Sequence, residues 1–222
     1  MDLVYVCRDG ENEELRYSIR SAIKNLPHDN IWLVGKKPDW YTGKFINVDK
    51  FGDSYDKVRE SLKVVSKTEE ISEQFVLMND DFFIVKPITD VPYFYTGTLS
   101  ERIAARRSGG YSRLLAKTEK DLRDRKFKDS LDYELHVPMV LTKSGVAQII
   151  DMPGLWRSTY GNVFNVGGSI RKDVKIYTHE DWENRPDLHE SEYLSTNDKS
   201  FTQIYKNVLR DMFSEPCALE HP

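Results

Sequence analysis

The strongest constraint on the fold is a series of short apolar runs in the first eighty residues, separated by stretches with helical spacing. The runs cover residues 3–7, 31–34, 45–48 and 75–78. Between them, apolar residues recur every three or four positions over 11–25 and over 55–66, the period of an amphipathic helix. Strands that are apolar on both faces and alternate with helices are typical of a parallel sheet covered by helices. The sequence therefore predicts an α/β fold with a mainly parallel sheet.

The length of the chain suits one such domain. It has 222 residues, of which 39% are hydrophobic and 31% charged, enough for a packed core under a solvated surface. No stretch is typical of a long linker, so we expect a single domain over 1–215 and a tail over 216–222. In the second half, the pattern predicts helices over 111–127, 142–150 and about 200–212, and a strand over 174–177.

Charge and cysteine content exclude several classes of protein. Lys and Arg number 32 against 36 Asp and Glu, so the net charge of −4 gives the whole chain no attraction for nucleic acid or anionic lipid. The two cysteines form no CxxC pattern, which favours a reduced, cytoplasmic protein. The first residues lack a basic region, and no run is long enough to span a bilayer, so neither a signal peptide nor a membrane partner is expected.

Acidic residues follow the apolar runs where strands are expected to end. Asp9 comes after the first run, Asp80 and Asp81 come after the fourth, and Asp198 precedes the last helix. Ligands of open parallel sheets bind outside the carboxyl ends of the strands, so we expect these side chains around one site. Mg²⁺ and Mn²⁺ are usually held by one or two carboxylates together with substrate phosphates. The pattern indicates a cation-bridged diphosphate; the alternative is that Asn79 and the two residues after it form only a solvated turn.

Two arginines lie on one face of the first predicted helix. Arg16 and Arg20 are one helical turn apart, and the helix begins beside Asp9 and Gly10. A helix N-terminus attracts anions, and two guanidinium groups can bind a phosphate bidentately. The alternative is that both arginines belong to an ordinary solvated surface.

His136 lies in an otherwise apolar segment. No second histidine stands at a metal-ligand spacing from it, so its functional interpretation is a general base that deprotonates an acceptor hydroxyl. The competing interpretation, a structural histidine, is the commoner one for such a residue. The aromatic residues at 40–41 and 93–95 fit either stacking on a base or sugar ring or packing in the core.

Five segments of the chain match a known family in order. They lie at 4–10, 14–21, 75–83, 134–139 and 195–198, and the most specific are the Glu-Leu-Arg-Tyr-Ser block of the second and the Asn-Asp-Asp block of the third. In these segments the chain resembles the Stealth family. That family includes bacterial capsular-polysaccharide sugar-phosphate transferases and the lysosomal-enzyme N-acetylglucosamine-1-phosphotransferase. The chain is also similar to short phage-encoded proteins that are usually labelled glycosyltransferases.

The resemblance implies a GT-A-like, Rossmann-type fold that binds a nucleotide-diphosphosugar donor and a divalent cation, Mg²⁺ or Mn²⁺. It implies these site residues: Asp9, Gly10, Arg16 and Arg20 at the donor; Asn79 beside Asp80 and Asp81 as metal and catalytic carboxylates; His136 in catalysis; Asn197 and Asp198 at the substrate and metal; and Arg157 at a phosphate. The chain departs from the family pattern at Arg8, at Met139, where a second histidine is common, and in its short length.

Three functions fit these residues. The first is transfer of a sugar-1-phosphate to an acceptor hydroxyl, by attack on the β-phosphorus. The second is transfer of the sugar alone to a glycan or to a modified base of phage DNA, by attack on the anomeric carbon. The third is a sugar-nucleotide binding module without turnover. The first two share the donor and the metal. Residues 106–107 and 117–128 are the candidates for a DNA-facing patch, and the acidic residues in the second segment favour a solvated helix instead.

Overall fold

The computed structural model describes residues 1–8, 12–49, 54–105 and 109–221. Its central feature is a five-stranded sheet in the order β3-β2-β1-β4-β7, in which only β7 runs antiparallel to its neighbour. The strands are β1 (Asp2–Val6), β2 (Ile31–Gly35), β3 (Lys44–Asn47), β4 (Gln74–Asn79) and β7 (Met139–Thr142). The predicted α/β fold with a mainly parallel sheet flanked by helices is therefore confirmed. The sequence pattern did not predict the antiparallel edge strand β7. It indicated only a short extended segment over 134–139.

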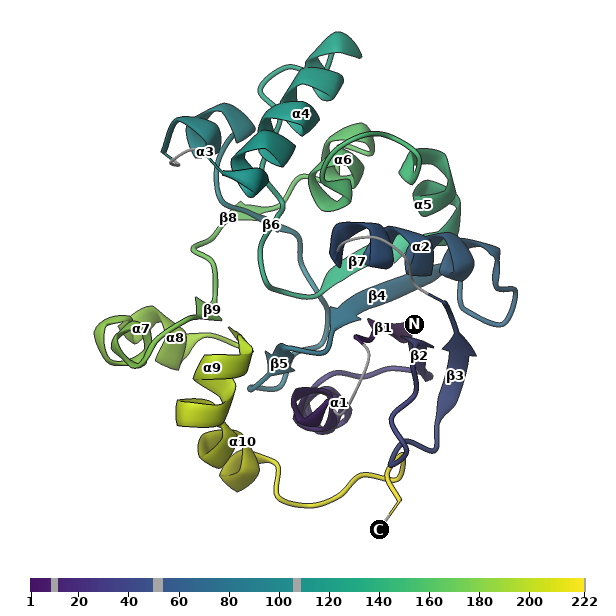
Figure 1. The fold of residues 1–222 in the computed structure, drawn as a ribbon, viewed down its shortest axis with the longest axis vertical. Helices are drawn as coiled ribbons and strands as arrows, with labels where there is room; N and C mark the ends of the chain where they lie inside the picture. Colours follow the sequence, from purple (N-terminus) through teal and green to yellow (C-terminus); the bar gives the residue numbers. More distant parts are fainter. Residues whose placement is uncertain (9–11, 50–53, 106–108, 222) are drawn as a thin grey trace.

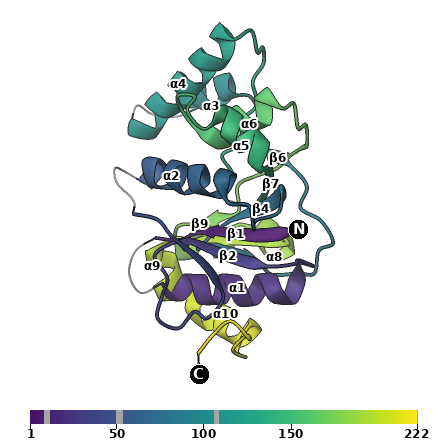
Figure 2. The same ribbon diagram turned by 90° about the vertical axis from the view of Figure 1, so that its right-hand side faces the viewer.

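The sheet lies between two layers of helices, because its strands are apolar on both faces (Figure 2). Side chains of β1 alternate between the layers: Leu3 and Tyr5 pack with α1 (Glu13–Asn25), and Val4 and Val6 pack with α2 (Ser54–Lys67). All four are buried. The period of two along the strand thus builds one core on each face of the sheet.

A second, three-stranded sheet continues from the carboxyl end of β4. It has the order β5-β10-β9 and consists of β5 (Phe82–Ile84), β10 (Tyr193–Thr196) and β9 (Lys175–Ile176). Only Asp80 and Asp81 separate β4 from β5. Because β10 pairs with β5 on one side and β9 on the other, residues more than ninety positions away in the sequence lie beside the Asn-Asp-Asp block.

The middle of the chain forms a group of helices above α2 (Figures 1 and 2). They are α3 (Leu99–Ala105), α4 (Gly110–Asp124), α5 (Lys143–Ile149) and α6 (Trp156–Val163). Leu99 and Leu155 form a small separate core with leucines of α4. The remaining short elements are β6 (Phe94–Tyr95), β8 (Ser169–Ile170), α7 (His179–Asn184) and α8 (Pro186–Glu190). No helix within the described ranges is long and apolar enough to cross a bilayer.

The last helix differs from its predicted form. It begins as α9 (Asp198–Ser200), passes through a π-helical segment, η1 (Phe201–Tyr205), and ends as α10 (Lys206–Met212). Its start is fixed by Asn197, whose side chain accepts a hydrogen bond from the backbone N–H of Ser200 at 2.8 Å. This capping box explains why the predicted Asn-Asp pair stands at a helix start.

The predicted tail is packed against the domain. Glu220 is buried, the N–H of Thr42 donates to the carbonyl of Leu219 at 2.9 Å, and the N–H of His221 donates to the carbonyl of Trp40 at 2.8 Å. The sequence pattern does not predict these contacts, because they join positions about 180 residues apart.

Candidate active site

A cavity of about 1060 Å³ opens at the carboxyl ends of β1 and β4. Its walls come from the sheet edge, from the chain after α4, from α6 and from the second sheet. The cavity lining includes these predicted residues: Asn79, Asp80, Asp81, His136, Arg157, Asn197 and Asp198. The structure thus brings residues from both halves of the chain to the place where an open parallel sheet binds its ligand.

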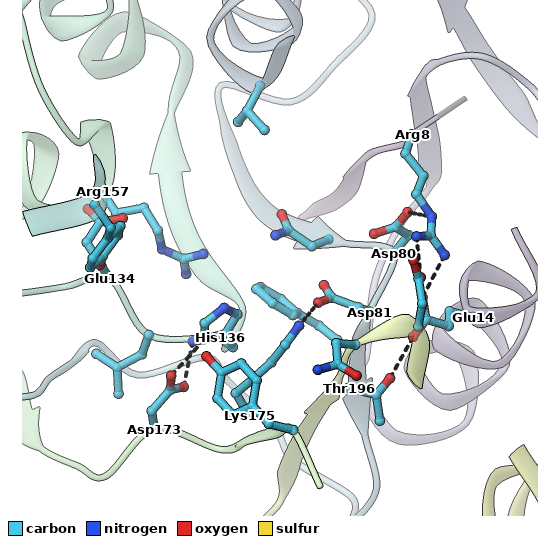
Figure 3. A pocket seen from close by; sticks show the side chains of 18 of the residues that line it. Arg8, Glu14, Asp80, Asp81, Glu134, His136, Arg157, Asp173, Lys175 and Thr196 are labelled. Carbon is cyan, nitrogen blue, oxygen red and sulfur yellow. Dashed lines mark hydrogen bonds and ion pairs between the residues drawn. The ribbon is translucent and has the colours of Figure 1, made fainter. Parts of the chain in front are cut away.

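Arg8 lies at one end of this cavity among four acidic residues. These are Glu14, Asp80, Asp81 and Asp198, and we call this part of the cavity the acidic end. Arg8 Nη2 donates to Glu14 Oε2 at 2.8 Å, its Nε lies 3.4 Å from Asp80 Oδ2, and its Nη1 forms an ion pair with Asp198. Figure 3 shows the Arg8 guanidinium beside Glu14 and Asp80. The side chain of Asn12, which caps α1 by accepting from the N–H of Leu15, donates to Asp80 as well. The start of α1 is therefore tied to the end of β4.

The acidic end carries more negative than positive charge when its groups are ionised. Burial raises the pKa of Glu14 to about 7. Burial, together with the nearby charge of Asp81, raises the pKa of Asp80 to about 6. Burial and like charge both disfavour an ionised carboxyl group, so these shifts show that Arg8 offsets only part of the charge around it. Additional positive charge would favour the ionised forms.

Asp81 pairs with a lysine of the second sheet. Lys175 of β9 forms an ion pair with its carboxylate, and the Oγ of Ser195 donates to the same oxygen at 3.3 Å. The Lys175 side chain is 9% exposed, so this pair is held inside the cavity wall. Sequence reasoning missed Lys175; the only signal was the strand predicted over 174–177.

His136 and Asp173 form a dyad across the cavity from Arg8 (Figure 3). Nδ1 of His136 lies 2.7 Å from Asp173 Oδ2, and the backbone N–H of His136 donates to Asp173 Oδ1 at 3.0 Å. Burial raises the pKa of Asp173, but hydrogen bonds from His136 outweigh it and hold that pKa below the usual value. An ionised carboxylate only accepts hydrogen bonds, so Nδ1 carries a hydrogen, and in the neutral imidazole Nε2 is then the acceptor. Sequence reasoning missed Asp173, which has no motif around it.

Arg157 supplies a positive group in the middle of the cavity, toward which its guanidinium points (Figure 3). The residue is 6% exposed, and its Nη2 donates to the carbonyl of Val137. Its buried Nε has no hydrogen-bond partner among the described residues. A guanidinium group directed into a cavity is suited to an anionic ligand, which it can bind with two parallel hydrogen bonds.

Glu134 holds the start of the helix that carries Arg157. Its Oε1 accepts from the backbone N–H and the hydroxyl of Ser158, at 2.8 and 2.9 Å. Burial raises the pKa of Glu134 to about 7, and the neighbouring charge of Arg157 only partly offsets this effect. Burial likewise lowers the pKa of Arg157. Sequence reasoning included Glu134 in a matching segment but gave it no role.

The structure does not bring Arg16 and Arg20 into the cavity. Arg20 is buried and binds Glu220 through Nε at 2.6 Å and Nη2 at 2.7 Å. Arg16 lies 3.4 Å from the same carboxylate and stacks over the ring of Trp40. Both guanidinium groups are directed to the C-terminal segment, which takes the place of the expected phosphate. Asp9 and Gly10, and the basic pair at 106–107, lie outside the described residues.

The donor set at the acidic end has the chemistry of a Mg²⁺ or Mn²⁺ site. Asp80, Asp81, Asp198 and Asn79 all offer oxygen ligands to the same cavity. In residues 1–8, 12–49, 54–105 and 109–221, no three acidic, histidine or cysteine side chains are already arranged around one point as metal ligands. Arg8 and Lys175 are paired with these carboxylates instead. The residue types and the excess of negative charge fit a divalent cation, provided that the ion replaces these pairs.

Comparison with known proteins gives distant structural likenesses. No family model and no curated protein matches the chain. Among solved structures, it is similar to the galactosyltransferase LgtC in complex with donor and acceptor sugar analogues, with 9% identity and a TM-score of 0.48 over 98% of this chain and 97% of the other. It is also similar to the apo form of the glycosyltransferase GlyE of Streptococcus pneumoniae TIGR4, with 10% identity and a TM-score of 0.37 over 99% of this chain and 64% of GlyE. The chemistry of this chain is therefore inferred from its own cavity residues.

Proposed function

We propose that this protein is a metal-dependent transferase that uses a nucleotide-diphosphosugar donor and moves a sugar-1-phosphate to an acceptor hydroxyl. One observation carries the proposal: a carboxylate cluster, the guanidinium of Arg157 and the His136–Asp173 dyad face one cavity. A cation site, an anion site and a base are the parts that phosphoryl or glycosyl transfer from a diphosphate donor requires. The sequence resemblance to sugar-phosphate transferases supports the same class.

The acidic end would bind the diphosphate of the donor. Asp80, Asp81 and Asp198 would hold Mg²⁺ or Mn²⁺, which supplies positive charge to the diphosphate when bound. Arg8 and Lys175, which pair with these carboxylates here, carry positive charge that phosphate oxygens can share. Without positive charge from these sources, a cluster of carboxylates would repel an anionic donor.

Arg157 would stabilise the phosphate that is transferred. It is held by contacts on several sides, because its guanidinium lies 5.7 Å from the ring centre of Phe82 and 5.5 Å from that of Trp156 and donates to the carbonyl of Val137. A donor fixed in this way needs little reorganisation when charge develops on the phosphate oxygens. Its guanidinium would donate to such an oxygen.

His136 would remove the proton from the acceptor. As the acceptor oxygen bonds to the β-phosphorus, its hydrogen moves to Nε2 of His136, and the bond from phosphorus to the bridging oxygen breaks to release a nucleoside monophosphate. Asp173 accepts from Nδ1, so it holds the imidazole in the tautomer that leaves Nε2 free and stabilises the charge that forms there. Asp80 is the alternative base.

The second enzymatic function, transfer of the sugar alone, uses the same groups. The acceptor oxygen would then attack the anomeric carbon, and a nucleoside diphosphate would leave. A glycan is the better acceptor for either reaction than modified DNA, because basic residues of the candidate DNA-facing segment, 117–128, are offset by acidic neighbours. Lys120 pairs with Asp124 at 2.5 Å, and Arg125 pairs with Asp121 at 2.9 Å.

The nucleotide product distinguishes these functions. The purified protein is incubated with a panel of nucleotide sugars and Mn²⁺ or Mg²⁺, with and without sugar acceptors, and the products are separated by chromatography. We expect release of a nucleoside monophosphate. Release of a nucleoside diphosphate would replace the proposal with glycosyl transfer, and donor binding without release from any donor would indicate a binding module.

A further inference from the structure

A second cavity, of about 530 Å³, adjoins the candidate active site. Four of the residues that line it are basic, namely Arg102, Arg171, Lys172 and Arg185, and we call it the basic cavity. The one acidic residue in its lining is Asp173, among the residues that the structure describes. Its volume falls in the range that holds a small organic molecule. An uncharged ligand would form no ionic interaction with such a lining.

The two cavities share a wall. Arg102, Asp173 and Arg185 line both of them. Because the Asp173 carboxylate also binds His136, a molecule in the basic cavity lies next to the dyad that would deprotonate an acceptor. This placement corresponds to the acceptor side of the site, since Arg8 and the carboxylates that would bind the donor lie across the main cavity (Figure 3).

The guanidinium groups of this cavity are held in place by carboxylates that do not line it. Arg171 is 3.1 Å from Glu192, and Arg185 is 2.7 Å from Asp187. Arg171 is also stacked over the ring of Phe94, 4.7 Å from its centre. Arg171 also donates to the Ser191 hydroxyl at 2.7 Å and Arg185 to the carbonyl of Asp173 at 2.6 Å, so the two guanidinium groups are fixed at the cavity wall.

Two of the basic residues differ in how firmly they are held. Arg102 forms an ion pair with Asp132, whose carboxylate lies 3.2 Å from its Nε, so its guanidinium is fixed at the cavity wall. Lys172 is exposed and forms no ion pair or hydrogen bond with any described residue. An exposed ammonium group beside three guanidinium groups in one lining is suited to a phosphate or a carboxylate.

From these observations, and resting on the proposed function, we propose that the basic cavity is an acceptor subsite for a sugar or similar hydroxyl compound that carries a phosphate or carboxylate group. The anionic group is held among Arg102, Arg171, Lys172 and Arg185, and the hydroxyl to be modified faces His136. The acceptor of this enzyme is therefore an anionic one, and a neutral sugar is a poor substitute.

Binding of small probes tests this proposal without a donor. The full chain is titrated by calorimetry with glucose 6-phosphate, glucuronate and glucose. We expect the charged probes to bind and glucose not to bind, and the stronger of the two shows whether a phosphate or a carboxylate is preferred. In Lys172→Glu the charged probe should bind about tenfold more weakly or worse, because an ionic hydrogen bond is lost and a repulsive charge is added.

Matched variants keep this test specific. Lys67→Glu makes the same charge change at an exposed position at the end of α2 and should leave binding unchanged, and Lys172→Arg should retain it. Equal binding of all three probes, or equal weakening by Lys172→Glu and Lys67→Glu, would overturn the subsite.

A second measurement separates the subsite from the transferase. Nucleotide release from the donor should be faster with the charged probes than with glucose. Release that is equally fast with glucose would overturn the proposal that the acceptor is anionic. It would leave the proposed transferase function unaffected. Selective binding of charged probes with no release from any donor would instead count against the proposed function.

Discussion

Nδ1 of His136 lies 2.7 Å from Oδ2 of Asp173, and the backbone N–H of the same histidine donates to the other oxygen of that carboxylate at 3.0 Å. The carboxylate therefore holds both the ring and the backbone of His136. The imidazole and the ring of Phe82 also form an edge-to-face pair, with ring centres 6.3 Å apart and ring planes at 82°. These contacts restrict the ring to one orientation, as a general base requires.

Replacement of His136 tests its role as the base. His136→Ala should lower kcat about 100-fold or more, since positioned proton transfer contributes at least this much, and added imidazole should restore part of the rate. The exposed His179→Ala is the matched control. A variant that turns over at the wild-type rate would assign the proton transfer to another group, of which Asp80 is the first candidate.

Asp173 acts through His136, so its replacement should separate two kinetic constants. Asp173→Asn keeps the shape of the side chain but removes its charge and one of the two oxygens that accept from His136, so kcat should fall at least about tenfold. The KM for the donor should not change, because Asp173 lies across the cavity from the acidic end. An increase in the donor KM with kcat unchanged would show that Asp173 has a different role.

Arg8 competes with a divalent cation for the same carboxylates. In Arg8→Met, the loss of its ion pairs with Asp80 and Asp198 should increase the affinity for Mn²⁺ about fivefold, the scale expected for two partly exposed ion pairs. Mn²⁺ binding is measured by electron paramagnetic resonance. Arg125→Met removes a surface arginine that pairs with Asp121, and it should leave the affinity unchanged. If Arg8→Met binds Mn²⁺ more weakly than the wild type, the ion does not replace Arg8.

The raised pKa values at the acidic end predict how stability depends on pH. The pKa of Asp80 is about 6 and that of Glu14 about 7 in the folded protein, above the ordinary values near 4 of the unfolded chain. Between these values the folded state binds more protons than the unfolded state, so this contribution to the free energy of unfolding falls as pH rises. From about pH 5.5 to about pH 7.5, we expect Tm to fall in the absence of a divalent cation.

A bound cation should reverse part of this loss, because it binds the ionised carboxylates. The increase in Tm caused by Mn²⁺ should therefore be larger at about pH 7.5 than at about pH 5.5. Asp80→Asn should remove most of that difference. An increase that is the same at both pH values would mean that Mn²⁺ does not bind at Asp80.

The pair formed by Arg20 and Glu220 is structural, and its removal should affect stability alone. Both side chains are buried, and Arg20 also donates to the carbonyls of Phe213 and Ser214, at 2.9 and 3.1 Å. Arg20→Met should lower the free energy of unfolding by about 3 kcal/mol, because the buried Glu220 carboxylate keeps only the more distant Arg16 guanidinium, at 3.4 Å, as an ionic partner. This is measured by urea denaturation. The donor KM of the folded variant should equal that of the wild type, and an increase would restore the donor-site role predicted for Arg20.

Sequence patterns predicted the parallel sheet and the carboxylates that follow β4, because both depend on local signals in the sequence. The apolar runs that became β1 and β4 are buried on both faces, and the side chains that follow β4 line the cavity. His136 was singled out as a polar residue in an apolar segment, and Arg157 through the family resemblance. In each case the residue types and their neighbours in the sequence carry the information.

The parts that were missed depend on long-range pairing. Asp173 lies 37 positions from His136, and Lys175 lies 94 positions from Asp81; each pair meets only because β9 joins the second sheet. Arg20 was misplaced for the same reason, since its partner Glu220 is 200 positions away. A helix face that has no partner nearby in the sequence can thus be covered by a distant segment of the same chain.

The central claim is that the carboxylates after β4 are needed for transfer from a nucleotide-diphosphosugar donor. It is tested most directly by cation-dependent nucleotide release from wild type, Asp80→Asn, Asp81→Asn and the control Asp39→Asn, which changes an exposed aspartate away from the cavity. Circular dichroism confirms that each variant is folded. The account predicts that Asp80→Asn and Asp81→Asn each lose about 100-fold or more in rate while Asp39→Asn is unchanged. Wild-type rates in Asp80→Asn and Asp81→Asn would contradict it.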